Sequence, residues 1–104
     1  MNEVAFKMKL KAGFEKEYQK RHDEIWPEMV TVLKNAGVYD YSIYLDKESN
    51  TLFAVQKLTD DNTADKLPQN EIVRQWWEYM ADIMEVNPDK SPVEVELKKV
   101  FHMD

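Results

Sequence analysis

The stretch Tyr18-Gln19-Lys20-Arg21-His22-Asp23-Glu24-Ile25-Trp26-Pro27-Glu28-Met29 lies inside the longest helical pattern of this 104-residue chain. Residues four apart on a helix share a face, so Tyr18, His22 and Trp26 are expected to point toward one region. The apolar residues at similar spacing form a stripe that should face a core: Phe14, Ile25, Met29, Val32, Leu33 and Ala36. His22 therefore occupies a position where an aliphatic residue would pack better, which is a first indication of chemistry.

The surrounding patterns predict the fold. One helix is expected over residues 14–36, ending at Gly37, where a left-handed cap is favourable. Pro27 lacks a backbone N–H and is expected to kink this helix just after His22. Strands are predicted at residues 4–10, 38–45, 51–58 and 93–101, and a second apolar seam predicts a helix over residues 70–85.

The order β-α-β-β-α-β is that of an α+β, ferredoxin-like split βαβ fold. We expect residues 1–104 to form one such domain, with a four-stranded antiparallel sheet and helices on one face. The other face of the sheet needs a cover, because Val38, Tyr44, Ala54 and Leu58 are expected there and are too apolar to lie in water. A second subunit against this face is therefore predicted, which makes the protein a homodimer.

The composition excludes several classes of protein. The net charge is −6 and the basic residues do not cluster, so nucleic acid is not an expected partner. The chain has no cysteine and only two histidines, His22 and His102, and no spacing suggests a metal site. No apolar run is long enough to span a membrane, and the N-terminus has no signal-peptide pattern. We therefore expect a cytoplasmic protein with no membrane partner.

Two features could carry chemistry. An imidazole titrates near neutral pH, so His22 can both give and take protons, although a lone histidine is often only a surface group or a satisfied core group. In the tandem Trp76-Trp77, adjacent helical residues point about 100° apart. One indole can therefore fill the core while the other borders a cavity, and an indole face suits the apolar C–H side of a sugar.

Three strand tyrosines, Tyr39, Tyr41 and Tyr44, add hydroxyl groups to this picture. Tyr39 and Tyr41 are expected on one strand face, which the helices could cover. A buried tyrosine hydroxyl needs a partner, which a bound polyol or a backbone carbonyl could supply. The sequence contains no Gly-rich phosphate loop, metal constellation or serine-nucleophile motif. The chemistry that remains is cofactor-free proton transfer in an aromatic pocket.

Short motifs along the chain, taken in order, resemble those of the L-rhamnose mutarotase family. They are Glu17-Tyr18, Arg21-His22, Ile25-Trp26-Pro27-Glu28, Tyr41-Ser42-Ile43-Tyr44-Leu45-Asp46, Leu52-Phe53-Ala54, Gln75-Trp76-Trp77, Tyr79-Met80, Asn87-Pro88-Asp89 and Ser91-Pro92. The resemblance covers nearly the whole chain and is poor around residues 63–69 and at the C-terminus. It implies a ferredoxin-like subunit, a homodimer of the dimeric α/β-barrel type, and cofactor-free interconversion of the α and β anomers of L-rhamnose.

The resemblance also implies roles for single residues. His22 falls at the family's proton-donor position, and Tyr18, Tyr41, Trp76 and Trp77 fall at its sugar-contacting positions. Two alternatives share the predicted fold or pocket: a cofactor-free monooxygenase of the dimeric α/β-barrel type, and a non-catalytic sugar-binding module. Fold does not separate these functions. Oxygen uptake with an aromatic substrate would identify the first, and rhamnose binding without faster anomer exchange would identify the second.

Overall fold

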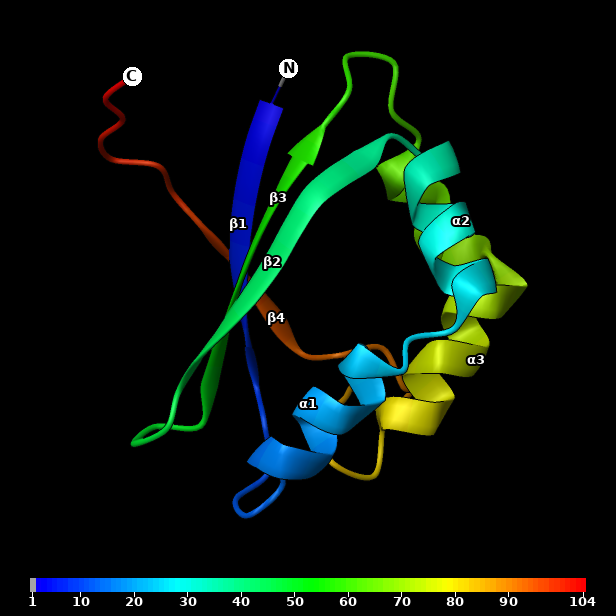
Figure 1. The fold of residues 1–104 in the computed structure, drawn as a ribbon, viewed down its shortest axis with the longest axis vertical. Coiled ribbons are helices and arrows are strands. Elements are labelled where there is room, and N and C mark those ends of the chain that lie inside the picture. The colour runs from blue at the N-terminus through cyan, green and yellow to red at the C-terminus, as the bar shows by residue number, and fades with distance from the viewer. Residues whose placement is uncertain (1) are drawn as a thin grey trace.

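The computed structural model describes residues 2–104 as a sheet with helices packed on one side (Figure 1). In chain order the elements are β1 Asn2–Lys9, α1 Glu15–Asp23, α2 Pro27–Asn35, β2 Val38–Asp46, β3 Thr51–Leu58, the 3-10 helix η1 Ala64–Gln69, α3 Glu71–Met80 and β4 Glu94–Leu97. The four strands pair antiparallel in the order β2-β3-β1-β4. The predicted α+β, ferredoxin-like architecture with a four-stranded antiparallel sheet is confirmed.

The core lies between the helices and one face of the sheet. Leu52 and Ile83 are fully buried, and the remaining core is built from further side chains of the sheet, the helices and the segment after α3: Met8, Leu10, Tyr18, Met29, Ala54, Val73, Trp76, Met80 and Met84. Residues that pair across the strands lie on the same face. One row that faces the helices therefore runs Leu45, Leu52, Met8 and Glu94 across all four strands.

The prediction of one kinked helix over residues 14–36 is wrong, because two separate helices occupy this stretch. Helix α1 ends at Asp23, and α2 begins at Pro27 after three non-helical residues. Trp26 has an extended backbone (φ −60°, ψ 131°), as expected for a residue that precedes proline. Pro27 is the first residue of α2, where its missing N–H costs no intrahelical hydrogen bond. Proline therefore starts a new helix here instead of bending an existing one.

Strand β2 also departs from the predicted pattern, because it contains a bulge. Its register with β3 shifts between Tyr39 and Ser42, and Asp40 has a positive φ of 47°. The extra residue changes the side-chain alternation, so Tyr39 and Tyr41 do not share a face as predicted. Val38 lies on the face that the helices cover and is 2% exposed.

Most of the residues that were predicted to lie on the outer face of the sheet do not lie there. Ala54 is fully buried beneath the helices, and Leu58 lies on the same face as Val38, its pairing partner. Tyr44 alone of the four predicted residues lies on the outer face. The row there runs Tyr44, Phe53, Lys7 and Val95 across the four strands, and all four of these side chains are exposed.

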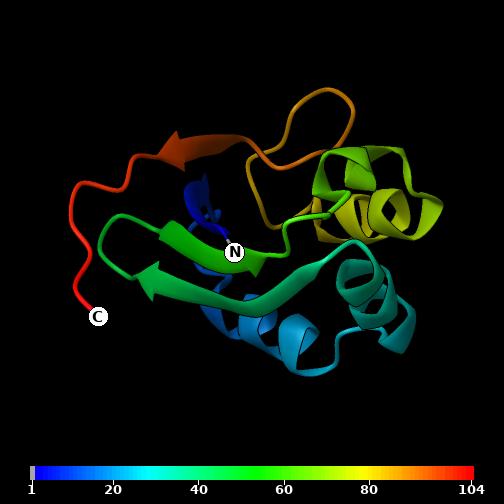
Figure 2. The same cartoon turned by 90° about the horizontal axis from the view of Figure 1, so that it is seen from above.

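Strand β3 covers the predicted residues 51–58 and β1 lies close to the predicted 4–10, whereas helix α3 and strand β4 end earlier than predicted. Helix α3 ends at Met80 and not at residue 85, and its N-cap Asn70 accepts hydrogen bonds from the backbone N–H groups of Ile72 and Val73. Strand β4 covers Glu94–Leu97 only, and residues 98–104 form an exposed segment without regular structure. In Figure 1 and Figure 2 this C-terminal segment runs away from the helices. No helix among residues 2–104 is long and apolar enough to cross a membrane.

Candidate functional site

A cavity of about 1220 Å³ lies between the helices and the covered face of the sheet. Its walls contain all five of the residues predicted for the site, namely Tyr18, His22, Tyr41, Trp76 and Trp77. These residues come from α1, β2 and α3, so the site forms only when these three elements are packed together. An aromatic-lined concavity of this size, with a few polar groups, is a typical small-molecule site.

The His22 imidazole is held in the cavity wall by three contacts. Its Nδ1 lies 3.1 Å from the backbone oxygen of Tyr18 one turn earlier. The ring stacks on that of Tyr18, with centroids 4.3 Å apart, and meets Trp76 at an angle of 89° and a centroid distance of 5.4 Å. A carbonyl oxygen only accepts hydrogen bonds, so Nδ1 carries the hydrogen and donates it. In the neutral ring, Nε2 is then left with a free lone pair.

Burial lowers the pKa of His22 below its ordinary value of 6.5. The hydrogen bond to the Tyr18 carbonyl and the nearby Asp23 carboxylate both act in the opposite direction, but desolvation of the charged ring is the larger effect. His22 is therefore a neutral imidazole at neutral pH, with Nε2 able to accept a proton.

The two predicted tyrosines differ in their settings. Tyr18 is buried at 8% exposure, and burial raises the pKa of its hydroxyl far above the ordinary value. Tyr41 is 38% exposed as a whole, but burial of its hydroxyl also raises its pKa. Both phenols therefore stay protonated at neutral pH and act as neutral hydrogen-bond donors and acceptors.

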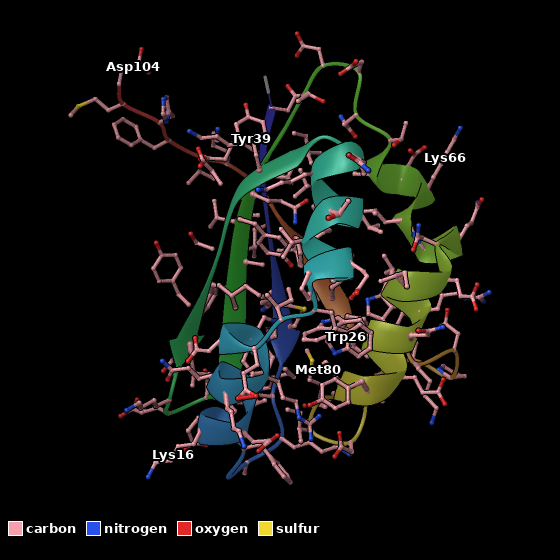
Figure 3. The ribbon with its side chains drawn as sticks, turned by 45° about the vertical axis from the view of Figure 1, so that its right-hand side comes forward. Lys16, Trp26, Tyr39, Lys66, Met80 and Asp104 are labelled. Atoms are coloured by element: carbon pink, nitrogen blue, oxygen red, sulfur yellow. The ribbon has the colours of Figure 1, made fainter. Side chains whose placement is uncertain are left out.

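The adjacent residues Trp76 and Trp77 differ in burial, as expected for side chains that point about 100° apart on a helix. Trp76 is a core ring, 6% exposed, and packs edge-on against both His22 and Trp26. Figure 3 shows Trp26 beside α3, where its ring also lies near that of Tyr79. Trp77 is only partly buried, and it borders both the core and the cavity. Trp77 is thus the more accessible of the two indole walls.

Four carboxylate residues line the cavity, namely Glu15, Asp23, Asp40 and Glu94, and the sequence analysis named none of them as a site residue. Glu94 lies on β4 opposite the buried Met8, which places it on the face covered by the helices. The residue is exposed as a whole, but partial burial raises the pKa of its carboxyl, and its charge helps to raise that of Tyr41. Glu15 also lines the cavity, and its Oε2 is buried without a hydrogen-bond partner. The alternation of residues 93–98 was visible in the sequence, but which side faces the helices depends on the pairing of β4 with β1.

A metal centre does not form among the described residues. Within residues 2–104, no group of three or more His, Cys, Asp or Glu side chains is arranged to hold a metal ion. The polar residues of the cavity wall instead include the His22 imidazole, four tyrosines and several carboxylates. These groups can exchange protons with a polar ligand and donate hydrogen bonds to its oxygens.

Comparison with known proteins identifies a close group of relatives. The family model described as L-rhamnose mutarotase matches residues 3–103. An L-rhamnose mutarotase of Phocaeicola vulgatus is 60% identical, and one of Bacteroides thetaiotaomicron is 59% identical, each over the whole of both chains. The crystal structure of L-rhamnose mutarotase FA22100 from Formosa agariphila superposes with a TM-score of 0.93 at 52% identity, again over the whole of both chains.

Proposed function

The chain belongs to the L-rhamnose mutarotase family, and from this premise we propose that its cavity binds L-rhamnose and that His22 interconverts the α and β anomers. The protein is an isomerase acting on a carbohydrate. Neither the monooxygenase nor the sugar-binding module, left open by the sequence, is favoured by the relatives. The observation that carries the proposed site is the seating of His22, with one nitrogen held by the backbone and the other free in an aromatic cavity.

Mutarotation requires one proton to move between two oxygens of the same sugar. The anomeric hydroxyl loses its proton and its oxygen becomes the aldehyde oxygen, while the bond from C1 to the ring oxygen breaks and the ring oxygen gains a proton. Rotation of the open aldehyde by half a turn and closure on its other face give the other anomer. The sum of these steps neither adds nor removes a proton, and no electrons leave the sugar.

His22 can serve both proton transfers through one atom. Neutral Nε2 takes the proton of the anomeric hydroxyl, and the resulting imidazolium donates a proton to the ring oxygen. Both oxygens are bonded to C1, so they lie close enough together to be reached from one nitrogen. The Tyr18 carbonyl keeps its hydrogen bond to Nδ1–H in both charge states, so the ring need not turn between the steps. His22 is thereby the proton donor that the family pattern suggests, after first acting as a base.

The other residues of the cavity bind and orient the sugar in this proposal. The hydroxyls of Tyr18 and Tyr41 stay protonated and can hydrogen-bond to sugar hydroxyls without competing for the transferred proton. Trp77 offers a partly exposed indole to the apolar side of the sugar, including the methyl group of a 6-deoxy sugar. Trp76 supports the imidazole from the core. Room for the aldehyde to rotate is provided by the volume of the cavity.

Anomer exchange measured by saturation-transfer NMR on equilibrated L-rhamnose tests this function. We expect the protein to accelerate transfer between the two anomeric proton signals well above the rate in buffer. A small panel of other free aldoses would define the preferred sugar. Binding of rhamnose at an unchanged exchange rate would instead identify a sugar-binding module.

We further propose that the protein is a homodimer that associates through the outer face of its sheet. Tyr44, Phe53 and Val95 are 64%, 37% and 51% exposed there and form one row with Lys7. Phe101 of the C-terminal segment is 78% exposed and packs on nothing in its own chain that would bury it. Exposed apolar rows of this kind are typical of association surfaces. The cytoplasmic location expected from the sequence stays a prediction.

A further inference from the structure

We propose that Arg21 is a positioning residue for the reaction, because it fixes α1 to the C-terminal end of α3 and thereby holds His22 against Trp76. This inference rests on the proposed role of His22 and adds a residue that does not itself touch the sugar. Arg21 precedes His22 in the chain and points elsewhere, since adjacent helical residues diverge by about 100°. It is not a residue of the cavity wall described above.

The guanidinium of Arg21 donates four hydrogen bonds, and all three of its nitrogens take part. Its Nε donates to Glu17 Oε2 at 2.7 Å, one turn earlier on α1. Its Nη1 donates to the backbone oxygen of Tyr79 at 2.8 Å and to Asp82 Oδ1 at 2.9 Å, and Nη2 donates to Asp82 Oδ2 at 3.3 Å. The side chain is only 11% exposed. Two parallel N–H···O bonds to one carboxylate fix orientation as well as distance.

A chain of ring contacts also connects the Arg21 guanidinium to His22 through Tyr79 and Trp76. Its central carbon lies 4.6 Å from the centroid of the Tyr79 ring. The Tyr79 ring lies 5.7 Å from that of Trp76, and Trp76 in turn lies 5.4 Å from His22. Arg21 and His22 are in addition joined directly by a peptide bond. A shift of Arg21 would therefore be passed to the imidazole both through the backbone and through the aromatic rings.

Helix α1 is short, and apart from the buried ring of Tyr18 and the contact of His22 with Trp76, the Arg21 hydrogen bonds are what join it to α3. It has nine residues, fewer than the roughly 12–15 at which an isolated helix becomes even marginally stable in water. It follows the turn at Gly13, which has a φ of +87°, and three non-helical residues separate it from α2. Tyr18 is its only buried residue. The hydrogen bonds from Arg21 also lower the pKa of the Asp82 carboxyl, as expected for a carboxylate paired with a guanidinium.

The test compares Arg21→Lys, Arg21→Met and Asp82→Asn with Lys20→Met, which removes a cation from an exposed position of the same helix. Lysine keeps the charge of Arg21 but has no planar fork. We expect both Arg21 variants to lower kcat for anomer exchange by about 10–100-fold, the cost of a misplaced catalytic group, with KM changed less than about twofold. Asp82→Asn should lower kcat less, and Lys20→Met should leave it unchanged.

A second readout separates positioning from general stability. The pKa of His22, followed by its imidazole proton signals in NMR, should rise toward its ordinary value in the Arg21 variants, because a released ring reaches water. Wild-type kcat and an unchanged His22 pKa in folded Arg21→Lys and Asp82→Asn would overturn the inference, whatever the change in Tm. If the wild-type protein shows no exchange, the proposed function fails. The His22 pKa still tests the positioning role of Arg21 in that case.

Discussion

The imidazole of His22 lies perpendicular to the indole of Trp76, with ring centroids 5.4 Å apart and an interplanar angle of 89°. Such edge-to-face contacts are favourable and directional, so the indole limits the rotation of the imidazole. Together with the Nδ1–H hydrogen bond to the Tyr18 carbonyl, this contact leaves Nε2 as the one nitrogen available for exchange with a ligand.

Replacing His22 by Ala or Gln should slow anomer exchange by about 10²–10⁴-fold, the usual contribution of a positioned acid–base group. The exchange rate at saturating L-rhamnose measures the effect, and circular dichroism checks that the variant is folded. His102, which is exposed in the C-terminal segment, provides the matched control through His102→Gln. Near-wild-type exchange in folded His22→Gln would falsify the catalytic role.

The two tryptophans should respond differently to truncation. Trp76→Ala removes a buried core ring and should destabilise the protein by about 3–5 kcal/mol, seen as a lower Tm. Trp77→Ala should instead weaken L-rhamnose binding with a smaller change in Tm, because Trp77 is only partly buried. Thermal melts and a rhamnose titration on both variants make the comparison. The assignment of the wall is wrong if Trp77→Ala binds rhamnose as the wild type does.

Activity should depend on pH through the lowered pKa of His22. Because Nε2 must be unprotonated to take the anomeric proton, exchange should rise with pH through a value below 6.5 and reach its plateau by neutral pH. Exchange rates corrected for the buffer reaction, measured from acidic to neutral pH, give this profile. A rate that falls as pH rises through the same value would mean that the charged ring starts the reaction.

The same lowered pKa makes a prediction about stability. A histidine that binds its proton less tightly in the folded state stabilises the fold above its unfolded pKa, and this contribution is lost as pH falls through the folded value. The wild-type protein should therefore lose more stability than His22→Gln between pH 6.5 and more acidic conditions. Urea unfolding of both proteins across this range measures the difference. Parallel curves would show that folding does not perturb His22.

Association through the sheet should be sensitive to Phe53. Phe53→Lys places a charge in the middle of the exposed outer row, so it should convert a dimer into a species with the 12.4 kDa mass of one chain. Gln75→Lys adds the same charge on an exposed position of α3 and should not affect association. Sedimentation at micromolar concentration distinguishes the outcomes. A one-chain mass for the wild-type protein would remove the dimer altogether.

Periodicity was enough to predict the order of the elements and the sheet, because the strands and helices each bury one apolar side. It failed where a single residue changes the local geometry. Pro27 can either kink a helix or start one; here the residue before it, Trp26, is extended and packs on Trp76 of α3, so a new helix begins. The bulge at Asp40 has no signal in an alternating pattern, yet it determines which of Val38, Tyr39 and Tyr41 face the helices.

The candidate site was predictable to a similar degree. Helical spacing brought Tyr18 and His22 together, and the tandem tryptophans and the family resemblance added Trp76; the structure places all three in one cavity wall, and their roles stay predictions. Glu94 could not be placed, since its side of β4 depends on pairing with a strand more than 80 residues earlier in the chain. Arg21 was part of a recognised motif, but its partner Asp82 lies 61 residues away. Interactions between distant segments are set by the assembled fold and leave no local pattern.

The interruption between α1 and α2 also has a practical consequence for protein engineering. Because Pro27 begins a helix of its own, His22 lies on a separate short helix, α1. This helix is preceded by the turn at Gly13 and followed by three non-helical residues. Residues of this segment can be replaced while α2 and α3 are left unchanged, provided that Arg21 keeps its hydrogen bonds to Asp82 and to the Tyr79 carbonyl. Libraries aimed at other sugars can therefore vary the α1 positions that line the cavity, namely Glu15, Lys16, Gln19 and Asp23, while Tyr18, Arg21 and His22 are kept.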